Sequence, residues 1–133
     1  MSCYEALIQY VESKPEAVSE YPFGPEAQVY KVCGKMFALF TEVEGCVRVN
    51  LKCEPDHAIE LRSIFDAVKP GYHMNKKHWN SVYLDGSLPL GEVCRMVDHS
   101  YELVFSKLPK QQRDWLMLRY SNASLFGSVK DVT

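Results

Sequence analysis

The sequence lacks the patterns that mark several large classes of protein. It has no run of 18 or more apolar residues that could cross a membrane, and no basic N-terminal segment followed by an apolar run, as a secretory signal would have. It contains no GxGxxG, P-loop, GxSxG or CxxC motif, so the usual signatures of nucleotide binding, hydrolase catalysis and zinc binding are missing. We therefore expect a cytoplasmic protein without membrane association.

The chain also has no large excess of charge of either sign. Its 15 Lys and Arg residues and 17 Asp and Glu residues give a net charge of −2, which excludes a generally polycationic protein that coats nucleic acids. The 133 residues, 47% of them hydrophobic, are typical of one globular domain that buries its own core. We expect this domain over residues 1–120 and a flexible C-terminal tail over residues 121–133.

The cysteines and histidines do not form a recognisable metal site. The five cysteines are odd in number and widely spaced, which favours reduced thiols. Cys46 and Cys53 are expected on opposite faces of one strand, and His73 and His78 are five residues apart, so neither pair is placed to chelate a metal. We predict no metal and no cofactor, with the cysteines acting as small buried hydrophobic residues.

Apolar spacing and turn residues predict the order of the elements. An amphipathic helix is expected before Pro15, and a second helix from Pro55 to a stop at residues 69–71, with Ala58, Leu61, Phe65 and Val68 as its buried stripe. A long helix follows Pro89, and Pro109 opens the last one. Residues 15–26 are predicted as a loop, and strands over residues 27–33, 35–43, 46–53, 72–76 and 79–84.

These elements predict an α+β fold with two layers. Strands joined by tight turns are antiparallel, and alternation of polar and apolar residues indicates one covered and one exposed face. One antiparallel sheet with helices on one face, in the order α-β-β-β-α-β-β-α with a further helix, satisfies this pattern. On the strand over residues 46–53, Arg48, Asn50 and Lys52 are expected on the exposed face.

No arrangement in the sequence indicates an active site. The carboxylates of Asp56 and Glu60, and those of Asp98 and Glu102, are four residues apart on predicted helices. Such pairs are typical of the solvated face of an amphipathic helix. We therefore predict a protein that is not an enzyme, with no catalytic residues.

One segment has an unusual composition. No acidic residue occurs between Asp66 and Asp85, although this interval contains lysines, aromatic residues, histidines and amides. Cations interleaved with aromatic and amide side chains can bind phosphates, stack on bases and reach groove edges of nucleic acids. The candidate DNA-binding residues are Lys69, Tyr72, His73, Asn75, Lys76, Lys77, His78, Trp79 and Asn80, with Arg48 and Lys52 extending the positive surface.

The same residues also allow a purely structural interpretation. Trp79 at the start of a strand is more often part of a core than a stacking platform. Lys76 and Lys77 can be solvated loop charges, and His73 and His78 can do no more than satisfy backbone hydrogen bonds.

Five stretches resemble the MmcQ/YjbR family of small bacterial proteins. They are YPFG at 21–24, GKMFA at 34–38, VRVNLKCEP at 47–55, PGYHMNKKHWNSVYLDG at 70–86 and DHSYELV at 98–104. The resemblance extends over residues 1–120. It implies a fold similar to that of secretion chaperones, which agrees with the predicted element order.

The resemblance also implies a function. Members of this family are described as DNA-binding proteins, from a shape likened to a double-wing DNA-binding motif, and no cofactor or reaction is attached to them. Carried onto this chain, the expected site is residues 72–80, with Lys35, Arg48 and Lys52 as supports. We expect binding of double-stranded DNA. The alternative is a protein-interaction or chaperone-like adaptor that holds a protein partner on the sheet face.

Overall fold

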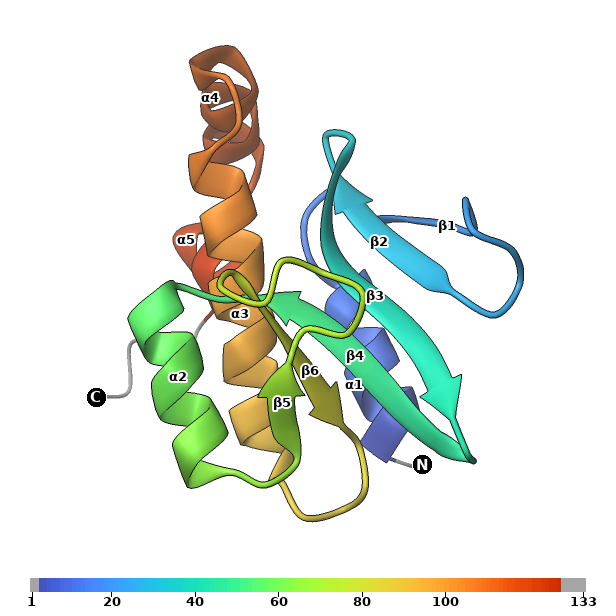
Figure 1. The fold of residues 1–133 in the computed structure, drawn as a ribbon. Helices are drawn as coiled ribbons and strands as arrows, with labels where there is room; N and C mark the ends of the chain where they lie inside the picture. The colour runs from blue at the N-terminus through green and yellow to red at the C-terminus, as the bar shows by residue number, and fades with distance from the viewer. Residues whose placement is uncertain (1–2, 128–133) are drawn as a thin grey trace.

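Six antiparallel strands form one sheet, in the spatial order β1-β2-β3-β4-β6-β5. The computed structural model describes residues 3–127, and Figure 1 shows α1, α2 and α3 packed on one face of this sheet. The α+β class, the antiparallel pairing and the covered face predicted from the sequence are confirmed. The elements are α1 (Cys3–Glu12), β1 (Val18–Glu20), β2 (Gln28–Val32), β3 (Lys35–Val43), β4 (Cys46–Lys52), α2 (Pro55–Ile64), β5 (Val68–Pro70), β6 (Trp79–Tyr83), α3 (Leu90–Ser106), α4 (Lys110–Arg119) and α5 (Asn122–Phe126).

The hairpins that join β2 to β3 and β3 to β4 have turns of the same kind. Each turn consists of two residues with positive φ, Cys33 and Gly34 in the first and Glu44 and Gly45 in the second. Two consecutive residues of this conformation form the turn whose twist matches that of antiparallel strands, and a glycine in the second position relieves its strain. These turns fix the register of the central strands.

The segment between α2 and β6 differs from the prediction. The helix ends at Ile64, because Phe65 takes an extended conformation, and Val68 is buried in β5 instead of on a helix. The predicted strand over residues 72–76 is wrong: β5 precedes it and pairs with β6, and residues 71–78 form a loop. The three-residue β5 is too short to show a period-2 pattern in the sequence.

Two further elements lie where the sequence predicts none. β1 forms within the predicted loop over residues 15–26 and pairs with β2, with Lys31 bound to Glu20 across the pair at 2.8 Å. α5 lies in the predicted C-terminal tail, where its Leu125 is fully buried. The packed structure therefore extends beyond residue 120, whereas residues 128–133 of that tail lie outside the described part.

The core lies between the sheet and the helices. α3 buries an apolar stripe that runs from Val93 to Val104, and its Tyr101 packs edge-to-face on Phe37 with ring centroids 5.1 Å apart. Phe37 is the extra residue of a β-bulge, since Tyr30 pairs with Ala38 and Lys31 with Met36.

Within residues 3–127, no helix is long and apolar enough to span a bilayer.

A buried ion pair links the end of α1 to α3. Asp98 is 2% exposed, so the prediction that it lies on a solvated helix face is wrong. The Lys14 ammonium lies 2.6 Å from Asp98 Oδ1, and the Tyr10 hydroxyl donates a hydrogen bond of 2.6 Å to the same oxygen. Burial and this hydrogen bond raise the pKa of Tyr10. The charge of Asp98 is tolerated inside because Lys14, 84 residues earlier in the chain, compensates for it.

Replacing Lys14 by Met should lower the free energy of unfolding by about 3–5 kcal/mol, because a buried carboxylate would lose its counter-charge. Urea unfolding monitored by circular dichroism measures this change. Lys110→Met is the control, since Lys110 forms an ion pair with Asp114 on the surface and should change the free energy by less than about 1 kcal/mol. Equal effects of the two substitutions would contradict a structural role for the buried pair.

Candidate nucleic-acid interface

The loop over residues 71–78, called the β5–β6 loop below, lies across the outer face of the sheet (Figure 1). Two buried polar side chains of the sheet hold it there. Ser81 Oγ accepts a hydrogen bond from the Tyr72 amide at 2.8 Å and donates one to Asn50 Oδ1 at 2.5 Å. Asn50 Nδ2 donates to the Tyr72 carbonyl at 3.2 Å. The loop backbone is therefore bound at one residue to both β4 and β6.

The loop leaves and rejoins the sheet through a close contact between Gly71 and Trp79. The Gly71 amide donates to the Trp79 carbonyl at 2.9 Å. A Cβ atom on residue 71 would lie 2.7 Å from Trp79 Cβ, which is closer than two carbon atoms can approach. Glycine at this position therefore allows the loop to close over the sheet.

Arg48 is buried beneath this loop, which corrects the prediction that it faces solvent. Its side chain is 7% exposed, and its guanidinium lies 4.3 Å from the centroid of the Tyr72 ring. Its Nε donates to Thr41 Oγ1 at 3.1 Å. Asn50, also predicted on the exposed face, is 1% exposed. Arg48 supports the exposed ring of Tyr72 from below and has little surface with which to reach a ligand.

Asn80 also lies away from the outer surface. It is 2% exposed and shares the helix-covered face of β6 with Val82, because alternate residues of a strand point to the same side. Its Oδ1 accepts a hydrogen bond of 2.7 Å from Nε of Arg62 on α2. Two of the candidate residues predicted from the sequence, Arg48 and Asn80, are therefore buried.

Most of the other candidate residues are exposed on or beside the loop. The side chain of Asn75 accepts a hydrogen bond from the Lys77 amide at 2.9 Å. This bond shapes the turn that carries Lys76 and Lys77. His78 and Trp79 are partly exposed. The exposed candidates are Lys69, Tyr72, His73, Asn75, Lys76 and Lys77.

A groove of about 580 Å³ runs beside the β5–β6 loop. Trp79 and His78 line it together with Lys52, so the tryptophan is neither fully buried nor fully exposed. Lys107, at the end of α3, lines the same groove and was not predicted. The full lining is Lys52, Cys53, Glu54, Pro55, Asn75, His78, Trp79, Leu103 and Lys107.

Lys107 and Arg62, which lie outside the segment predicted from the sequence, also contribute to the groove and the β5–β6 loop. Lys107 lies 27 residues after Asn80 in the chain, so only the packing of α3 brings it to the groove. Arg62 donates hydrogen bonds to the backbone carbonyls of Lys76 and Trp79 and so attaches the loop to α2. In the sequence, Arg62 stands out only as a basic residue near the end of a helix. Basic residues are common there because they stabilise helix ends in general, so this position did not indicate a role for Arg62 in the surface.

Lys35 is exposed at the start of β3 and is not among the residues that line the groove. It lies at the same end of the sheet as Lys52 and Trp79, because β3 runs antiparallel to β4 and Lys52 pairs with Trp79. The sequence-predicted residues are therefore divided between the loop and groove, one separate exposed lysine, and two buried side chains.

Of the residues that the structure describes, Glu54 is the one acidic residue that lines the groove, beside the basic Lys52 and Lys107, and its carboxylate is hydrogen-bonded at the start of α2. It accepts hydrogen bonds from the amides of His57 and Asp56, and these bonds lower its pKa. Burial raises the pKa of the neighbouring Cys53 thiol to about 11, which makes it a poor nucleophile at neutral pH. Among residues 3–127, no three His, Cys, Asp or Glu side chains are grouped so as to hold a metal ion.

Replacing Ser81 by Ala should lower the free energy of unfolding by about 1–3 kcal/mol, since the Tyr72 amide and Asn50 Oδ1 would lose a buried partner. Hydrogen exchange at the Tyr72 amide should also become faster. Ser106→Ala is the control, because Ser106 Oγ donates to the Leu103 carbonyl at an exposed position. Unchanged exchange at Tyr72 in Ser81→Ala would contradict the role assigned to this hydrogen bond.

Comparison with known proteins identifies the family to which this chain belongs. The YjbR family model matches residues 12–103. The Escherichia coli K12 protein YjbR is 40% identical over 111 residues, which cover 84% of this chain and 94% of that protein. YbdF of Escherichia coli O157:H7 is 40% identical over 93 residues, which cover 70% of this chain and 76% of that protein.

The solved structures agree with this assignment. The crystal structure of the Deinococcus radiodurans protein DR2400 superimposes with a TM-score of 0.79 at 34% identity, and the match covers 87% of this chain and 88% of that one. A Pseudomonas syringae protein gives a TM-score of 0.69 at 25% identity, over 75% of this chain and 97% of that one. The relatives, the matched family model and the shared fold show that the chain belongs to the YjbR family.

Proposed function

We propose that this protein binds double-stranded DNA, without catalysing a reaction on it, through the β5–β6 loop and the adjacent groove. The observation that carries the proposal is the concentration of lysines around a groove bordered by Trp79, in a chain whose net charge is −2. A positive surface on a protein of slightly negative net charge localises binding to one face, because only that face attracts phosphates.

Four lysines supply the phosphate contacts. Lys76 and Lys77 are exposed on the β5–β6 loop, while Lys52 and Lys107 line the groove from β4 and α3. None of these four has an ion pair among those found in residues 3–127, so their ammonium groups can exchange counterions for phosphates. Lys69, exposed on β5, extends the positive surface along the sheet edge.

Polar and aromatic side chains of the loop supply the remaining contacts. His73, Asn75 and His78 offer hydrogen bonds to sugars or groove edges. The exposed Tyr72 ring lies on the Arg48 guanidinium, which holds it facing outward. The loop acts as one projecting wing of a double-wing arrangement, and the β2–β3 turn beside Lys35, at the same end of the sheet, acts as the other.

Fluorescence anisotropy of a labelled DNA duplex, titrated with protein at 50 and 200 mM salt, tests the proposal. Contacts to about four phosphates should give a log–log salt slope near −3.6, which is about a hundredfold weaker binding at the higher salt. Lys76→Glu/Lys77→Glu should abolish binding while leaving the circular dichroism spectrum unchanged, because both side chains are exposed.

The matched control is Lys110→Glu/Arg119→Glu on α4, which changes the net charge by the same amount at exposed positions outside the groove. It should retain most of the affinity. Equal losses in the two double variants would indicate a general charge effect and contradict the assigned surface. Absence of binding at 50 mM salt with folded wild-type protein would reject DNA binding in favour of a protein-binding adaptor.

A further inference from the structure

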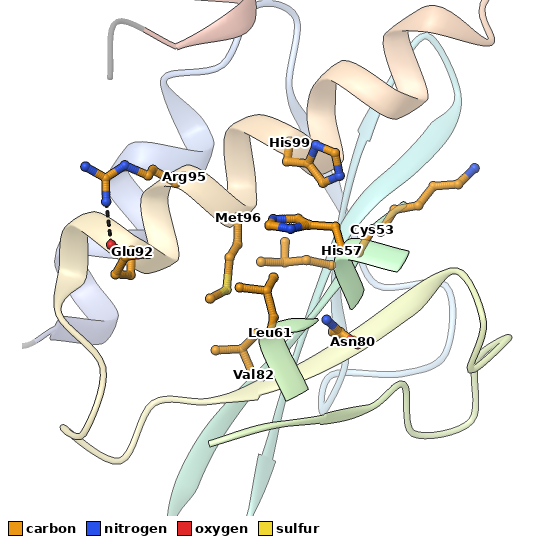
Figure 2. Close-up of a pocket in the computed structure, with 11 residues that line it drawn as sticks. Cys53, His57, Leu61, Asn80, Val82, Glu92, Arg95, Met96 and His99 are labelled. Carbon is orange, nitrogen blue, oxygen red and sulfur yellow. Dashed lines mark hydrogen bonds and ion pairs between the residues drawn. The ribbon is translucent and has the colours of Figure 1, made fainter. Parts of the chain in front are cut away.

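A second pocket, of about 130 Å³, lies on the opposite side of β4 and β6 from the β5–β6 loop. Figure 2 shows it between α2 and α3, with Leu61, Val82 and Met96 among the side chains around it. Of the DNA contacts proposed above, only Lys52 borders this space, and its side chain lies on the other face of β4. An apolar cavity of about 150 Å³ in another protein is large enough to bind benzene, so this pocket is of the right size for a molecule with one small ring.

One polar group in this pocket has no partner. The side chain of Asn80 is buried, and its Nδ2 atom makes no hydrogen bond. Its orientation is determined by Arg62, whose Nε can only donate and therefore requires Oδ1 on its side, at 2.7 Å. Figure 2 shows the Asn80 amide nitrogen pointing toward the other labelled lining residues. A buried donor without a partner destabilises the protein unless something in the pocket accepts its hydrogen bond.

The charges around the pocket favour an uncharged occupant. The guanidinium of Arg95 already forms an ion pair with Glu92 at 2.5 Å. His99 Nε2 lies 3.2 Å from the Glu54 amide and accepts its hydrogen bond, so this nitrogen is already engaged with the backbone. Lys52 alternates with Leu51 along β4 and has its side chain on the outer face. A charged ligand would therefore lose its hydration without gaining an unpaired lysine, arginine or carboxylate as a counter-charge inside the pocket.

Two histidine rings restrict the shape of the ligand that the pocket can hold. His57 on α2 and His99 on α3 are in edge-to-face contact, with ring centroids 5.3 Å apart. Together with Leu61 and Met96 they form walls suited to a flat, apolar ring. The pocket thus combines apolar walls of ring size with a buried amide donor, Asn80 Nδ2, that has no partner within the described residues.

We propose that this pocket binds a small uncharged molecule, about one six-membered ring in size, with one hydrogen bond acceptor that receives the Nδ2 proton of Asn80. Heteroaromatic rings and small cyclic carbonyl compounds belong to this class. The apolar lining supplies affinity by removing the ring from water, and Asn80 supplies specificity, because only a ligand with an acceptor satisfies its amide.

Pyridine and benzene test this proposal directly, since they have nearly the same size and shape and differ in one acceptor nitrogen. The ¹⁵N-labelled protein is titrated with each at pH 7.5, where pyridine is uncharged, and the side-chain amide signals are recorded. Pyridine should shift the Asn80 signal and saturate, with an affinity about tenfold higher than that of benzene, the difference expected of one hydrogen bond. Equal affinities would overturn the role of Asn80, and absence of binding by both would overturn the pocket.

Asn80→Asp is the matched variant, because its carboxylate keeps an oxygen for Arg62 and loses the donor. Pyridine should bind it no more tightly than benzene does. Asn75→Asp, on the exposed loop outside the pocket, is the control and should bind pyridine as the wild type does. If Asn80→Asp kept the tenfold preference for pyridine, the assignment of the donor would be wrong. The comparison of the two ligands on wild-type protein decides the proposal even if Asn80→Asp does not fold.

Discussion

The hydrogen bond between Ser81 and Asn50 is the interaction on which the functional surface depends. Both side chains lie on a face of the sheet that carries no helix, and a buried polar pair there needs a cover that completes its hydrogen bonds. The Tyr72 backbone provides that cover. Once the loop is held at Tyr72, Arg48 is buried below it, and Lys76 and Lys77 are exposed on the loop. The Ser81–Asn50 pair thus holds the lysine-bearing β5–β6 loop over the outer face of the sheet.

The sequence predicts those parts of the fold that depend on local pattern. The strands from Gln28 to Lys52 and the helix that begins after Pro89 show their own periodicity and turn residues, and they form as predicted. The errors occur where distant residues decide. Asp98 has the spacing of a solvated helix residue, yet Lys14 makes its burial possible. Arg48 alternates as an exposed residue, yet a loop more than 20 residues later in the chain covers it.

The same division applies to the site. The absence of acidic residues between Asp66 and Asp85 is a local property, and it marks the segment that carries the exposed lysines Lys76 and Lys77. Lys107 reaches the groove through the packing of α3, which no spacing in the sequence reveals. β6 connects the two surfaces that result. Its Trp79 and Ser81 support the loop and groove, while Asn80 between them faces the pocket under α2 and α3.

The two outer strands of the sheet have a consequence for the behaviour of the protein at high concentration. β1 and β5 are three residues long, so each edge presents few backbone groups that a strand of another molecule could pair with. Pro70 has no amide hydrogen to offer, and Lys69 and Glu20 place charges along the two edges. Such short, charged edges disfavour edge-to-edge growth of the sheet and thus protect the folded protein from β-aggregation.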